Sequence, residues 1–109
     1  MKLGSITRVW QCTEDDRPDE DTTMIARIGN AQTVGKVVDE ADKGTAIPLS
    51  KYICIKPLDK NKLLPRYLYY AMQYVHMEGY WRRVSTPYLG DKHKITITEV
   101  RNVQVKETF

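Results

Sequence analysis

The sequence predicts an α+β fold, in which a small, twisted, mostly antiparallel β portion packs against one main helix. Short segments rich in β-branched residues recur between residues 3 and 57, as is typical of strands. Pro65 then opens a segment of helical periodicity that continues to about residue 84. A chain of 109 residues is long enough to bury one core. We therefore predict a single domain over residues 1–109.

The predicted β portion begins with a short strand within residues 3–12, where Ile6, Val9 and Trp10 are apolar. Residues 13–23 follow, with six Asp or Glu around one proline. Such a run is typical of a solvated loop. A carboxylate cluster that binds a metal is the less favoured alternative, because no His or Cys stands beside it.

Residues 23–40 are typical of two strands joined by a turn at "GNAQ". Gly35, inside the second of these strands, predicts a bulge or a close approach of another group to the backbone. A further strand is predicted over "YICIK" and ends at Pro57.

The helix that opens at Pro65 carries two stripes of apolar or aromatic residues. The residues expected to face the sheet are Leu68, Ala71, Met72 and Val75. The second stripe, interpreted as packing residues with wet hydroxyls, comprises Tyr67, Tyr70 and Tyr74. Tyr69 is expected to point elsewhere. Gly79 predicts a stop or a kink, with a shorter helical piece at residues 80–84.

The last segments are predicted as a loop over residues 85–94 and a strand or helix start from Ile95 onward. For the helical alternative, Thr98 is the predicted N-cap.

Composition favours a folded protein, with 41% hydrophobic and 28% charged residues. The sequence lacks an apolar run of about 20 residues and a signal-like start, so we expect a cytoplasmic protein with no membrane contact. Cys12 and Cys54 lie far apart without a CxxC motif. We interpret both as reduced, buried side chains.

Charge is distributed unevenly along the chain. Residues 1–55 contain 7 Lys or Arg against 9 Asp or Glu, whereas residues 56–106 contain 10 against 4. A basic half favours contact with a polyanion such as nucleic acid. Solubility alone explains such a distribution equally well.

Catalytic motifs are missing from the sequence. The two histidines, His76 and His93, have no nucleophile in a familiar local context, and there is no GxSxG, HExxH or phosphate-binding glycine loop. We therefore predict a non-enzymatic protein that needs no cofactor or metal.

Basic residues interleaved with an aromatic one follow the helix, a pattern that suits contact with phosphates and bases. The candidate DNA contacts there are Arg82, Arg83, Tyr88, Lys92, His93 and Lys94. The candidates from the predicted strand pair and its turn are Arg27, Asn30, Gln32 and Lys36.

Five segments in this order resemble the target recognition domain of type I restriction-modification specificity subunits. They are "LGSI", "IARIGNAQTVGKVV", "YICIKP", "LLPRYLYYAMQ" and, after Gly90, "ITITEVRNVQV". The resemblance implies a non-catalytic DNA-binding specificity module. It also implies two partners, double-stranded DNA and the methyltransferase subunit of a restriction-modification complex.

The chain departs from that family pattern in two respects. Family members usually carry two such domains separated by long helices, whereas this chain has one domain and no long heptad helix. In addition, an acidic loop stands where a variable, base-reading region is expected. These departures leave an alternative open, a trimmed mobile-element copy that acts as a protein-interaction module. It would dock through its aromatic helix onto a restriction-modification subunit, or onto a second copy as a homodimer.

Overall fold

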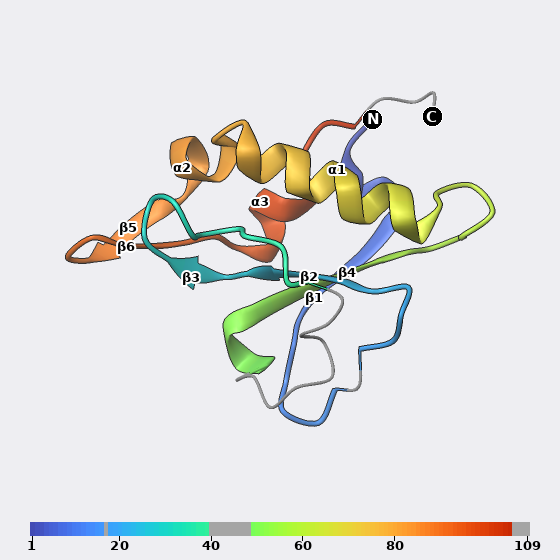
Figure 1. The fold of residues 1–109 in the computed structure, drawn as a ribbon, viewed down its shortest axis with the longest axis horizontal. Coiled ribbons are helices and arrows are strands. Elements are labelled where there is room, and N and C mark those ends of the chain that lie inside the picture. The colour runs from blue at the N-terminus through green and yellow to red at the C-terminus, as the bar shows by residue number, and fades with distance from the viewer. Residues whose placement is uncertain (17, 40–48, 106–109) are drawn as a thin grey trace.

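The computed structural model describes residues 1–16, 18–39 and 49–105 and has the α+β architecture that the sequence predicts (Figure 1). The elements are η1 (Leu3–Ser5), β1 (Thr7–Gln11), β2 (Thr23–Ala26), β3 (Ile28–Gly29), η3 (Leu49–Lys51), β4 (Tyr52–Pro57), α1 (Pro65–Met77), α2 (Tyr80–Val84), β5 (Thr86–Leu89), β6 (Lys92–Lys94) and α3 (Ile97–Arg101). Within the described ranges, no helix has the length and apolar character needed to cross a membrane.

The central sheet has the strand order β1-β4-β2 and is antiparallel throughout. Ile55 of β4 lies opposite Val9 on one side and Thr23 on the other. Because side chains alternate along a strand, Ile53 and Ile55 point to one face and Cys54 to the other. Figure 1 shows α1 and α3 on one side of this sheet, which is therefore covered by helices on that face.

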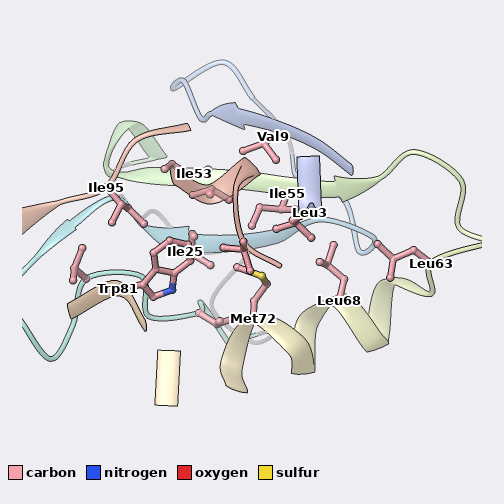
Figure 2. Close-up of a cluster of buried hydrophobic side chains, with 14 residues drawn as sticks. Leu3, Val9, Ile25, Ile53, Ile55, Leu63, Leu68, Met72, Trp81 and Ile95 are labelled. Atoms are coloured by element: carbon pink, nitrogen blue, oxygen red, sulfur yellow. The ribbon is translucent and has the colours of Figure 1, made fainter. Parts of the chain in front are cut away.

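The main core lies between the sheet and these helices (Figure 2). Leu68 and Met72 of α1 are 1% and 0% exposed, and Val75 packs against the same cluster while half-buried. Ala71 is also half-buried. The predicted core-facing stripe of the helix is thus confirmed, with Leu68 and Met72 at its centre.

The tyrosine stripe was wrongly interpreted as a packing stripe. Tyr67, Tyr70 and Tyr74 are 37%, 52% and 62% exposed, whereas Tyr69 is half-buried and packs against the core. The reason is helical phase, because each residue turns by about 100° and Tyr70 is two residues from both Leu68 and Met72. Tyr70 therefore lies on the side of α1 that faces away from the sheet.

The predicted break after α1 is confirmed, because α2 begins at Tyr80 immediately after Gly79. Trp81 of α2 is 1% exposed and belongs to the main core. The second strand predicted between residues 34 and 38 is reduced to an isolated pairing of Val37 with Ile25. Gly35 has a φ of +79° and lies against the Trp81 indole, which confirms the predicted close approach.

The last helix, α3, begins two residues earlier than Thr98 would place it. Thr96 is the N-cap: its hydroxyl accepts from the Glu99 backbone N–H, and the Glu99 carboxylate accepts from the Thr96 N–H. The prediction of Thr98 was wrong because Thr96 and Glu99 have the spacing of a capping box, which stabilises a helix start more strongly than a lone threonine.

The interpretation of two reduced cysteines was also wrong. Cys12, directly after β1, and Cys54 of β4 form a disulfide, with their Cα atoms 5.9 Å apart. Both side chains are buried on the sheet face that points away from α1, together with Met24. Forty-two positions separate the two cysteines in sequence, but antiparallel pairing of β1 with β4 brings them together.

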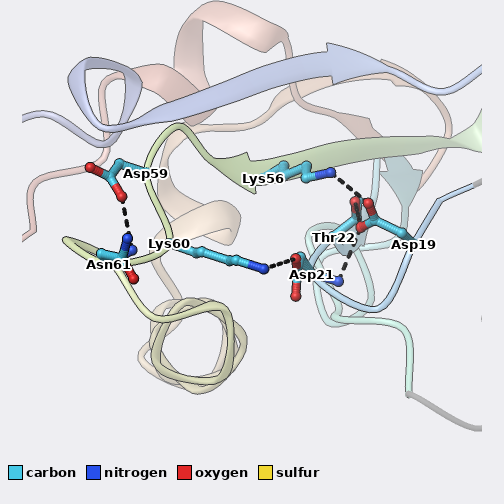
Figure 3. A network of polar contacts seen from close by, with 7 residues as sticks. All are labelled: Asp19, Asp21, Thr22, Lys56, Asp59, Lys60 and Asn61. Atoms are coloured by element: carbon cyan, nitrogen blue, oxygen red, sulfur yellow. Dashed lines mark hydrogen bonds and ion pairs between the residues drawn. The ribbon is translucent and has the colours of Figure 1, made fainter.

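The acidic segment after β1 is held to the sheet by cations (Figure 3). Lys56 of β4 forms an ion pair and a hydrogen bond with Asp19, and Lys60 lies 4.0 Å from Asp21. The Asp19 carboxylate also accepts from the Thr22 hydroxyl. Among the described residues, no group of three or more His, Cys, Asp or Glu side chains is placed to hold a metal ion.

The ion pair makes stability depend on pH. The hydrogen bond from Lys56 holds the pKa of Asp19 below its ordinary value of 3.8. The carboxylate therefore stabilises the fold above that value, and the contribution is lost as the pH falls through the lower pKa of the folded state. Both side chains are more than a third exposed, at 38% and 49%, so solvent screens the pair.

We expect Lys56→Met to lower the free energy of unfolding at pH 7 by less than about 1 kcal/mol. The difference from the unmodified chain should shrink as the pH is lowered below 3.8, because Asp19 then becomes neutral in both proteins. Urea unfolding at a series of pH values measures this. A difference that stays constant down to the lowest pH would show that Lys56 acts through packing of its aliphatic stem.

Candidate nucleic-acid interface

The segment predicted as a loop is a β-hairpin, formed by β5 and β6. Thr86 pairs with Lys94 and Pro87 with His93, and the register then shifts, so that Leu89 pairs with Lys92. The prediction of a loop was wrong because both faces of the hairpin meet solvent, which removes the alternation of apolar and polar residues by which strands are recognised. Gly90 and Asp91 between the strands are the signal that could have identified the turn.

The hairpin is anchored at its base and exposed along its length. In the second sheet, of order β3-β6-β5, only Ile28 and Gly29 of β3 pair with β6. All four residues of β5 are exposed. Figure 1 shows the hairpin extending beyond the rest of the chain at one end of the molecule. It is therefore accessible from both faces.

The hairpin separates its candidate residues by face. Lys92 and Lys94 are both exposed and, two residues apart on one strand, they point to the same side. Lys94 Nζ lies 5.5 Å from the centre of the Tyr88 ring, which is a cation–π distance. His93 is half-buried on the other side, and its Nδ1 lies 3.0 Å from the Ser85 hydroxyl. His93 thus holds the hairpin base to the end of α2.

Arg82 and Arg83 are exposed on α2, which the buried Trp81 fixes to the core. Arg83 donates from Nη1 to the Glu78 carbonyl at 3.0 Å, and its guanidinium lies 6.0 Å from the Tyr80 ring. Figure 1 places α2 at the same end of the molecule as the hairpin. The two arginines and the two lysines therefore form one cationic end.

The turn after β3 lies beside α2. Asn30 uses its side-chain oxygen to accept from the backbone N–H groups of Gln32 and Thr33, so it shapes the turn. His76 Nε2, on α1, lies 2.7 Å from the Gln32 carbonyl oxygen. Gln32 and Arg82 line a common hollow of about 220 Å³.

The remaining two candidates differ in exposure. Lys36 is exposed at the end of the turn. Arg27 is half-buried and donates from Nη2 to the Ser50 carbonyl at 3.2 Å. This bond and the partial burial favour a structural role for Arg27, although its Nε is buried without a partner among the described residues. The structure thus brings Arg82, Gln32 and the hairpin cations to one end, whereas Arg27 is half-buried and bonded to the Ser50 carbonyl.

The fold defined by these elements is an α+β domain in which a three-stranded antiparallel sheet is covered by helices, with a second small sheet ending in an exposed hairpin. It is similar to part of a solved structure, the type I restriction-modification system S subunit from M. genitalium, with a TM-score of 0.67 and 12% sequence identity. The match covers 94% of this chain and 32% of that chain, so this chain spans about a third of the S subunit.

No protein-family model matches the sequence, and a search of curated proteins found no match. At 12% identity the structural similarity concerns the fold alone. It confirms the fold that the order of the five sequence segments implied.

Proposed function

We propose that the chain is a non-catalytic DNA-binding module of the specificity-subunit type, and that the β5–β6 hairpin is the part that enters a DNA groove. The observation that carries the proposal is the exposed hairpin with Lys92 and Lys94 on one side. The major groove of DNA, about 12 Å wide, admits a two-stranded β-ribbon.

The cationic residues near the hairpin are suited to the DNA backbone. Arg82 and Arg83 on α2 present guanidinium groups that phosphate accepts bidentately. Tyr88, which is 43% exposed beside Lys94, offers a ring to a sugar or a base. Contacts to phosphates position a protein on DNA, and contacts to bases discriminate between DNA sequences. In a restriction-modification complex, such a module would supply target recognition to the methyltransferase subunit.

The double substitution Lys92→Ala with Lys94→Ala tests the hairpin. We expect about tenfold weaker binding to duplex DNA and a salt slope lowered by about two, because two phosphate contacts are lost. Thermal stability should change by less than about 0.5 kcal/mol, as is usual for exposed positions. Fluorescence anisotropy titrations at several salt concentrations, with melting curves, measure both.

The matched control is Lys60→Ala with Lys62→Ala, which removes the same charge from the segment between β4 and α1. Figure 1 shows that segment at the opposite end of the molecule from the hairpin. The control should retain most of the affinity. Equal losses in both variants would mean that only net charge matters, and the hairpin would then have no special role.

A second pair, Arg82→Ala with Arg83→Ala, should also weaken binding while leaving the chain folded. If this pair proved necessary for folding and irrelevant to DNA, α2 would have to be removed from the proposed interface.

A further inference from the structure

The side of α1 that faces away from the core is itself apolar and aromatic. Tyr70, Tyr74 and Met77 are 52%, 62% and 79% exposed. Surface helices normally present polar residues to water, and a helix with two apolar sides is normally covered on both. In the described part of the chain, the sheet covers one side of α1, and on the other side these three side chains are exposed.

The spacing of this surface matches the contact line between two helices packed side by side. Tyr67, Tyr70, Tyr74 and Met77 follow one another at intervals of three, four and three residues. That spacing is the repeat by which one helix presents side chains to a second helix. We define these four residues as the tyrosine face. A helix is therefore the occupant that its geometry fits.

Charge around the tyrosine face indicates the chemistry of that helix. Two cations lie near this face, because Met77 lines a common hollow with Arg82, and Arg66 stands beside Tyr70. The guanidinium of Arg66 lies 5.8 Å from the centre of the Tyr70 ring, directly beside the face. Two copies of so basic a surface would repel each other, whereas a helix with carboxylates beside its apolar stripe would be attracted.

We propose that the tyrosine face is a docking surface for an amphipathic helix of another protein, with an apolar stripe flanked by Asp and Glu. This goes beyond DNA binding, because α1 contributes none of the proposed DNA contacts, although Arg82 lies near both surfaces. The tyrosines supply rigid amphipathic contact area at low entropic cost, and Arg66 selects for acidic flanks.

Three synthetic peptides test the proposal against the full chain. The first is an 18-residue helix with leucine at the three- and four-residue spacing and glutamate beside it. The second replaces the glutamates by lysines, and the third has the composition of the first in scrambled order. We expect the first peptide to bind at least tenfold more tightly than either of the others, as measured by fluorescence anisotropy.

Two variants locate the binding on the chain. Tyr70→Ser with Tyr74→Ser should abolish binding of the acidic helix and leave DNA binding unchanged. Lys92→Ala with Lys94→Ala should weaken DNA binding and leave binding of the acidic helix unchanged. Failure of this proposal and failure of the DNA proposal can therefore be told apart. Arg66→Glu should transfer the preference to the lysine peptide. Circular dichroism melting of each variant confirms that it is folded.

The other outcomes overturn the proposal. Equal binding of the acidic and scrambled peptides would mean attraction of charge without a helix site. Indifference to the tyrosine substitutions would place the site elsewhere. A concentration-dependent dimer, detected by sedimentation equilibrium and dissociated by the tyrosine variant, would make a second copy the occupant instead.

Discussion

Replacing Gly35 with alanine should lower the free energy of unfolding by about 3 kcal/mol or more. Gly35 has a φ of +79°, in the region that side chains with a Cβ disfavour, and a Cβ built there would overlap the indole of Trp81. Trp81 is 1% exposed and part of the main core, so the ring has little room to move away. Chemical unfolding monitored by tryptophan fluorescence measures the loss.

Gly90 is the matched control, because it also has a positive φ, +59°, but has open space where a Cβ would stand. Gly90→Ala should lower the free energy of unfolding by about 1 kcal/mol, which is the cost of a positive φ for a residue with a Cβ. If the two alanine variants lost the same stability, the contact between Gly35 and Trp81 would contribute nothing, and the packing of α2 would need revision. The arrangement of the cationic end depends on that packing.

Reduction of the Cys12–Cys54 disulfide should lower the free energy of unfolding by about 2 to 4 kcal/mol. The bond closes a long loop, because its cysteines have a sequence separation of 42, and so it restricts the unfolded chain. It also ties the end of β1 to the central strand β4, next to the acidic segment. Guanidinium unfolding with and without a reductant measures the difference.

The double variant Cys12→Ala with Cys54→Ala controls for effects of the reductant itself, since its stability should not respond to it. Thiol titration of the unfolded chain, without reductant, should find no free thiol. Two free thiols and identical midpoints with and without reductant would mean that the cysteines are not bonded and act only as buried side chains.

Much of the fold follows from local signals in the sequence. Pro65 marks the start of α1, Gly79 its end, and Pro57 the end of β4, because each residue limits the backbone in a way that its neighbours cannot override. The position of Gly35 inside a β-like segment indicated a close approach, although the side chain involved, Trp81, is 46 residues away. Only the tertiary fold determines that Trp81 is the side chain that approaches Gly35.

The errors concern features that local patterns do not determine. Two stripes of α1 were both apolar, and only the sheet decides which one is buried. The disulfide depends on strand pairing between distant segments. The hairpin has no buried face, so its strands lack periodicity, and its candidate residues could be named only by their chemistry. The sequence did not show that Arg82, Lys92 and Lys94 lie at one end while Arg27 is half-buried.

The most direct test of DNA binding by the cationic end is the affinity of the unmodified chain for duplex DNA as a function of salt. If Arg82, Arg83, Lys92 and Lys94 each neutralise one phosphate, the logarithm of the association constant should fall against the logarithm of salt concentration with a slope of about −3 to −4. A slope near zero, or no binding at low salt, would contradict the proposed interface.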